Sequence, residues 1–61
     1  MDLGLELRIS RIKAGLQQQQ IARQIGIEAT RLSKIEHGWL EPSEEETERI
    51  KEAIEQASAR K

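Results

Sequence analysis

The side chains between residues 7 and 35 are suited to binding an anion. The stretch holds six bases against a single acid, Glu28, and the bases lie on both sides of the glutamine run QQQQ at positions 17–20. Charged Lys and Arg side chains donate strong hydrogen bonds to phosphate oxygens. The total net charge of −1 argues against a nucleic-acid partner, but the distribution of charge along the chain matters more than its sum.

The charges divide the chain into a basic centre and an acidic C-terminal piece. Residues 1–40 carry six bases and four acids, whereas residues 41–61 carry four bases and seven acids. This asymmetry favours a surface for nucleic acid in the centre of the chain.

Catalytic chemistry is not expected from these residues. The sequence has one histidine, His37, and no cysteine, and it shows no Ser/His/Asp arrangement, acid pair or phosphate-cradling glycine loop. We therefore expect no enzyme activity, no catalytic residue, no cofactor and no metal site. A chain of 61 residues makes one domain, which we place at 1–61. No apolar run approaches the roughly 18 residues of a membrane span, and the start of the chain is not typical of a signal peptide, so a cytoplasmic location is expected.

Helix-forming residues and helix stop signals place the elements that must position these side chains. The predicted first helix is capped by Asp2 and runs to about residue 14, where Gly15 ends it. Short helices are predicted at 18–25 and 29–36, and Ser43 followed by three glutamates predicts a last helix over 44–57. The chain is therefore predicted to be all-α.

The joint between the two short helices indicates their arrangement. Gly26 lies between two isoleucines, as in a tight turn with a positive φ and buried neighbours. The predicted core around this turn comprises Ile21, Ala22, Ile25, Ile27, Leu32 and Ile35. Two short amphipathic helices joined in this way are typical of a helix-turn-helix.

The stretch GLQQQQIARQIGIEATRLSKIEHG at 15–38 resembles the phage-repressor and Cro-type, or xenobiotic-response-element, family of helix-turn-helix transcriptional regulators. The matching positions extend to Leu3-Gly4, Leu7-Arg8 and Arg11 upstream and to Pro42-Ser43 downstream, so the resemblance covers about residues 3–57. It implies a lambda-repressor-like bundle of four to five short helices. It also implies that the third helix enters the major groove of double-stranded DNA.

The resemblance implies roles for individual residues. Base contacts are expected from Ala29, Thr30 and Lys34, and phosphate contacts from Gln17, Gln18, Arg31, Ser33 and His37. Gln17 and Gln20 can also form a glutamine version of a capping box, and Gln19 is expected to face solvent. Arg11 and Glu36 occupy positions that pair between the first and third helices. We favour this structural ion pair over the alternative, a phosphate contact by Arg11.

The loop after Gly38 and the first helix both depart from the family pattern. After Gly38, where relatives often carry Lys or Arg, the sequence reads Trp39-Leu40-Glu41, and Trp39 either caps the core or belongs to a partner surface. In the first helix, Ser10 replaces a usual leucine on the core face with Leu3, Leu7 and Ala14. A second apolar stripe on the opposite face comprises Leu5, Ile9 and Ile12. This stripe is either a dimer surface or packs through Ile9 or Ile12 against the last helix.

The sequence therefore predicts a sequence-specific DNA-binding transcriptional regulator that acts as a homodimer in a bacterial or phage-infected cell. The alternative is a protein-interaction module of the same fold, antitoxin-like or an adaptor. In that case Trp39-Leu40 and the acidic last helix would bind a protein partner.

Overall fold

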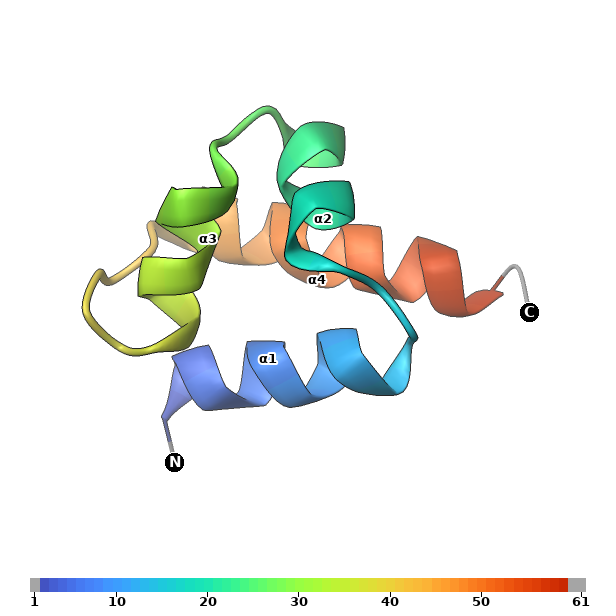
Figure 1. Ribbon diagram of the computed structural model, residues 1–61, viewed down its shortest axis with the longest axis horizontal. Helices are drawn as coiled ribbons and strands as arrows, with labels where there is room; N and C mark the ends of the chain where they lie inside the picture. The colour runs from blue at the N-terminus through green and yellow to red at the C-terminus, as the bar shows by residue number, and fades with distance from the viewer. Residues whose placement is uncertain (1, 60–61) are drawn as a thin grey trace.

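The structure, a computed structural model, describes residues 2–59 and contains four helices and no strand within that range. Helix α1 spans Leu3–Lys13, α2 Gln18–Ile25, α3 Ala29–Glu36 and α4 Glu44–Ala59 (Figure 1). The all-helical prediction is confirmed, and the bounds of the two short helices agree with it. Helix α1 ends one residue earlier than expected and α4 continues two residues beyond its predicted end.

The helix ends follow from their local side chains. Asp2 Oδ1 accepts a hydrogen bond of 3.1 Å from the Gly4 backbone N–H and so caps α1. Gly26 adopts a φ of 79°, a left-handed conformation that ends α2 and lets the chain turn directly into α3. At α4, Ser43 Oγ accepts from the Glu46 N–H at 3.1 Å, and a Glu46 carboxylate oxygen accepts from the Ser43 N–H at 3.3 Å. This reciprocal pair is a capping box.

The core lies between the helix-turn-helix formed by α2 and α3 and the two longer helices. Figure 1 shows α1 running beneath the α2–α3 pair and α4 crossing behind it. The buried apolar side chains come from all four helices and the turn after α1: Leu7, Ala14, Ile21, Ala22, Leu32, Ile35, Ile50, Ala53 and Ile54. Of the predicted core around the turn, Ile25 and Ile27 are only partly buried and pack against this cluster.

One predicted core position is wrong. Ser10 is exposed rather than part of the buried face of α1, and it lines a surface groove of about 600 Å³ between α1 and α4. A hydroxyl in this groove keeps its contact with water, which a buried position would have denied it.

Helix α1 approaches the end of α3 closely because residue 4 has no side chain. A Cβ atom at Gly4 would collide with the backbone carbonyl oxygen of Ile35. Gly4 is buried within α1, so this close approach sets the distance between α1 and the last turn of α3.

Candidate nucleic-acid interface

One face of α3 carries the polar side chains for which base contacts were predicted. Thr30 and Lys34 are exposed, and together with Arg31, Glu28 and Leu40 they line a surface hollow of about 420 Å³. Ala29 is partly buried and packs against the core, so only part of its methyl surface faces outward. The structure thus gathers Thr30, Arg31 and Lys34 on one surface of α3.

Glu28 brings a negative charge to this hollow. It is the residue before α3, and its carboxylate makes no cap hydrogen bond to the helix. Instead its Oε2 accepts a long hydrogen bond of 3.4 Å from the Thr30 hydroxyl. Because a bond of this length is weak, the Thr30 hydroxyl can readily exchange Glu28 for another hydrogen-bond partner.

Arg31 is held by an acid from another helix. Its Nε lies 2.6 Å from Glu46 Oε2 and its Nη2 lies 3.0 Å from Glu46 Oε1, so the two side chains pair through two parallel hydrogen bonds. These bonds lower the pKa of Glu46 below its ordinary value, and the same pairing raises the pKa of Arg31. The sequence analysis missed Glu46. Its spacing from Ser43 is a capping-box signal, but the pairing with α3 spans 15 residues.

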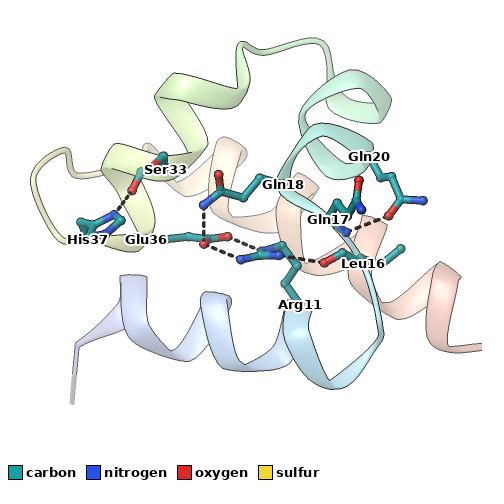
Figure 2. Close-up of polar contacts among 8 residues, drawn as sticks. All are labelled: Arg11, Leu16, Gln17, Gln18, Gln20, Ser33, Glu36 and His37. Carbon is teal, nitrogen blue, oxygen red and sulfur yellow. Dashed lines mark hydrogen bonds and ion pairs between the residues drawn. The ribbon is translucent and has the colours of Figure 1, made fainter.

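Arg11 and Glu36 form an ion pair between α1 and α3. Arg11 Nε donates to Glu36 Oε2 at 2.7 Å and Nη2 donates to Oε1 at 3.1 Å (Figure 2). Arg11 Nη1 also donates to the Leu16 carbonyl oxygen at 2.7 Å. The Glu36 side chain is only 1% exposed, and among residues 2–59 no buried side-chain nitrogen or oxygen lacks a hydrogen-bond partner. The pair fixes the last turn of α3 against α1.

Gln18 joins this ion pair, a contact that the sequence analysis did not foresee. Its Nε2 donates to Glu36 Oε1 at 3.0 Å, so Glu36 receives hydrogen bonds from both α1 and α2 (Figure 2). An amide nitrogen carries two N–H donors, and the bond to Glu36 uses one of them. Gln18 can therefore hold α2 against α3 while its second N–H remains a potential donor.

The remaining glutamines of the QQQQ run lie at the start of α2. Gln20 Oε1 accepts from the Gln17 backbone N–H at 2.7 Å, which is the return bond of a capping box made with glutamine (Figure 2). Gln17 and Gln19 are exposed. The run thus forms an ordered helix start, in which Gln17 is the N-cap residue of α2.

His37, Ser33 and Trp39 lie together at the end of α3. His37 Nδ1 is 2.7 Å from the Ser33 carbonyl oxygen, and because a carbonyl only accepts, Nδ1 carries the proton (Figure 2). The His37 ring stacks on Trp39 with ring centroids 4.9 Å apart. Trp39 is 76% exposed, so the interpretation of Trp39 as a cap over the core is wrong. The next residue, Leu40, packs against the core instead.

The second apolar stripe of α1 faces outward. Leu5, Ile9 and Ile12 are 45%, 41% and 55% exposed, so the alternative that Ile9 or Ile12 is buried against the last helix is wrong. Helix α4 faces the opposite side of α1, where Leu7 and Ala14 line the groove together with Ile54.

No group of three or more His, Cys, Asp or Glu side chains among residues 2–59 is arranged to hold a metal ion. No helix in this range is long and apolar enough to cross a membrane.

Comparison with known proteins gives one match. The sequence profile of a family described as "Helix-turn-helix domain" matches residues 2–58, which is nearly the whole chain. Searches of curated proteins and of solved structures found no significant match.

Proposed function

The chain belongs to the helix-turn-helix domain family, and on this basis we propose that it is a small transcriptional regulator that binds double-stranded DNA in a sequence-specific manner. In helix-turn-helix proteins the second helix of the motif enters the major groove and the first crosses the backbone. Here these are α3 and α2. The protein acts by occupying a site on DNA, and no chemical step is part of the proposal.

The observation that carries the proposal is the exposed polar face of α3. Thr30 and Lys34 project from a helix whose other face is anchored in the core by Leu32 and Ile35. Lys34 can donate to guanine O6 and N7, Thr30 can serve several bases, and the outward part of Ala29 can touch a thymine methyl group. A rigid helix with a short row of donors is what direct readout requires.

Phosphate contacts come from the ends of the helices around α3. The second amide N–H of Gln18 and the side chain of Gln17 are placed at the start of α2, where backbone N–H groups also favour an anion. Toward the C-terminal end of α3, Nε2 of His37 and the hydroxyl of Ser33 can donate to phosphate oxygens of the DNA backbone. Arg31 is the remaining contact in the proposal, although Glu46 engages it in the free protein.

We also propose that the protein binds DNA as a homodimer, because the α3 helix of one copy contacts only half of a palindromic site. We assign its interface to the exposed stripe of Leu5, Ile9 and Ile12. Glu6 and Lys13 lie on one flank of this stripe, on either side of its midpoint, and both line the groove toward α4. In an antiparallel pairing of two copies of α1, Glu6 of each copy therefore comes beside Lys13 of the other.

The second candidate function is a protein-interaction module of the same fold, antitoxin-like or an adaptor. The 76% exposure of Trp39 favours it, because a large aromatic side chain on a loop is a common anchor in protein interfaces. Trp39-Leu40 and the acidic start of α4 would form the binding surface. A regulator of either kind would work in the cytoplasm of a bacterial or phage-infected cell.

Selection of bound sequences from random DNA duplexes tests the proposal. We expect enrichment of a palindrome whose half-sites lie about one helical turn apart. Lys34→Ala should relax the preference at one position of each half-site and leave the others unchanged. Enrichment of no sequence, together with capture of a protein partner that Trp39→Ala abolishes, would instead favour the interaction module.

A further inference from the structure

We infer that Glu46 competes with DNA phosphate for Arg31 and thereby weakens and tunes the affinity of α3 for DNA. The inference rests on the proposed DNA-binding function and adds to it a residue, on a different helix, that controls a phosphate contact.

The geometry of the pair is that of a carboxylate in the place of a phosphate. The two bonds of 2.6 and 3.0 Å occupy the Nε and Nη2 side of the Arg31 guanidinium, the same parallel arrangement that phosphate oxygens take. Arg31 lies on the outward part of α3, its side chain is 45% exposed, and it lines the same hollow as Thr30 and Lys34. The pair therefore sits on the surface that DNA must approach.

Glu46 is fixed in this position by the start of α4. Its Oε1 accepts from the Ser43 N–H as well as from Arg31, and its own N–H donates to Ser43 Oγ. Its side chain is only 13% exposed. The capping box thus holds the carboxylate toward α3, so Glu46 loses little additional freedom when it pairs with Arg31.

Two other ion pairs show what is particular to this one. Arg11–Glu36 is nearly buried and joins α1 to α3, so it serves the fold. Glu45–Arg49 lies within the exposed side of α4, with both side chains more than half exposed. Among the ion pairs of the described residues, only Arg31–Glu46 involves a basic side chain of the proposed DNA-binding surface. Glu45 therefore provides a control with the same charge in the same helical turn.

The opposite role for Glu46 has a physical basis as well. A guanidinium has five N–H donors and Glu46 accepts from two of them, so the alternative role is that Glu46 orients the other three toward phosphate. That role predicts that loss of the Glu46 charge weakens binding. We infer competition because the Glu46 carboxylate has two effects, and both oppose binding. It occupies the Arg31 guanidinium, and it brings negative charge to a surface that phosphates approach.

Substitution of Glu46 by glutamine tests the inference. Gln at this position keeps the capping-box bond to Ser43 but loses the charge that holds Arg31. We would measure the affinity of the wild-type protein, Glu46→Gln, Glu45→Gln, Arg31→Ala and the Arg31→Ala/Glu46→Gln double variant for a random-sequence duplex at about 50 to 200 mM salt, by fluorescence anisotropy. Circular dichroism of each variant checks that the helices are intact.

The competition predicts a specific order of affinities. Glu46→Gln should bind about fivefold more tightly than wild type at the lowest salt, clearly more than Glu45→Gln, and its plot of log affinity against log salt should steepen by about 0.9, the value for one added phosphate contact. In the Arg31→Ala background the additional gain should disappear and leave only the effect seen for Glu45→Gln.

Two results would overturn the inference and leave the proposed function standing. If Glu46→Gln binds more weakly than wild type, Glu46 orients Arg31 for DNA. If the gain in affinity of Glu46→Gln equals that of Glu45→Gln, or persists in the Arg31→Ala background, the gain reflects only the change in net charge. If neither wild type nor Glu46→Gln binds any duplex at about 50 mM salt, the proposed function itself fails and the inference fails with it.

Discussion

Arg11 of α1 and Glu36 of α3 meet at 2.7 Å, and the same Glu36 carboxylate accepts a 3.0 Å hydrogen bond from Gln18 of α2 (Figure 2). One buried carboxylate therefore joins α1 to the two helices that carry the candidate DNA-binding surface. These hydrogen bonds fix the orientation of α2 and α3 relative to each other and to α1.

Removal of Arg11 should be strongly destabilising. Arg11→Ala leaves Glu36 buried with one remaining side-chain donor, and the loss of one partner of a buried pair costs about 3–5 kcal/mol. A domain of this size has about that much stability in total, so most of the variant should be unfolded at room temperature. Urea unfolding followed by circular dichroism measures the effect. Arg8→Ala, at an exposed position of the same helix, should change stability by less than about 0.5 kcal/mol.

The glutamines of the QQQQ run should differ in their contribution to stability. Gln18→Ala removes a hydrogen bond to a buried charge and should cost about 2 kcal/mol. Gln20→Ala removes the bond to the Gln17 N–H at the helix start and should cost about 0.5–1 kcal/mol. Gln19→Ala should be neutral or slightly stabilising, because alanine is the better helix former. Equal effects of all three substitutions in urea unfolding would contradict these assignments.

Two glycines should tolerate alanine to different degrees. Gly4→Ala places a methyl group against the Ile35 carbonyl oxygen, where neither backbone can move freely, so a loss of about 3 kcal/mol is expected. Gly26→Ala meets open space but requires an alanine at a φ of 79°, which costs about 1 kcal/mol. Thermal unfolding of the two variants checks the order. A larger loss for Gly26→Ala would show that α1 does not approach α3 as closely as described.

The Arg31–Glu46 pair should make stability depend on pH in the acid range. Since Arg31 lowers the pKa of Glu46 in the folded state, the pair stabilises the protein above the ordinary carboxyl pKa, and this contribution is lost as pH falls through the lower folded value. Wild type should therefore lose more stability than Glu46→Gln between about pH 5 and 3. Arg31→Ala should fall between the two and closer to Glu46→Gln, because the Ser43 backbone and Arg49 still lower the pKa of Glu46 in that variant. If wild type and Glu46→Gln show parallel urea-unfolding profiles against pH, the pair does not form in solution.

The proposed dimer interface predicts a change in assembly state. Ile9→Glu places a charge at the middle of the apolar stripe of α1, so sedimentation equilibrium should show a monomer at concentrations where wild type is a dimer. Gln19→Glu, which adds the same charge at an exposed position of α2, should remain dimeric. A monomeric wild type, or a dimeric Ile9→Glu, would remove this stripe as the interface.

Local signals were enough to predict most of the fold. The cap at Asp2 and the turn at Gly26 depend on neighbouring residues, so the start of α1 and the join between α2 and α3 follow from local sequence. Ser10 was wrongly placed because helical periodicity gives the face of a residue but not the width of the neighbouring groove. The outward position of Trp39 likewise depends on which of two adjacent apolar residues, Trp39 or Leu40, the loop turns inward.

The candidate site was less accessible to sequence reasoning, because its polar contacts join distant segments. The spacing of Ser43 and Glu46 indicates a helix start, but nothing local relates Glu46 to Arg31 on α3. The contact of Gln18 with Glu36 spans 18 residues and depends on how α2 and α3 pack. Residues with one expected role, such as Gln18, thus have a second that only the packed structure reveals.

We propose that α3 carries the DNA-binding surface, and a matched pair of lysine substitutions tests this proposal. Lys34 lies on the exposed face of α3, whereas Lys51 lines the groove between α1 and α4, and each loses one positive charge on substitution by alanine. Titration with the selected duplex at about 50 mM salt should show about tenfold weaker binding by Lys34→Ala and a change of less than about twofold for Lys51→Ala. Equal effects of the two substitutions, or no binding by the wild-type protein, would contradict the claim.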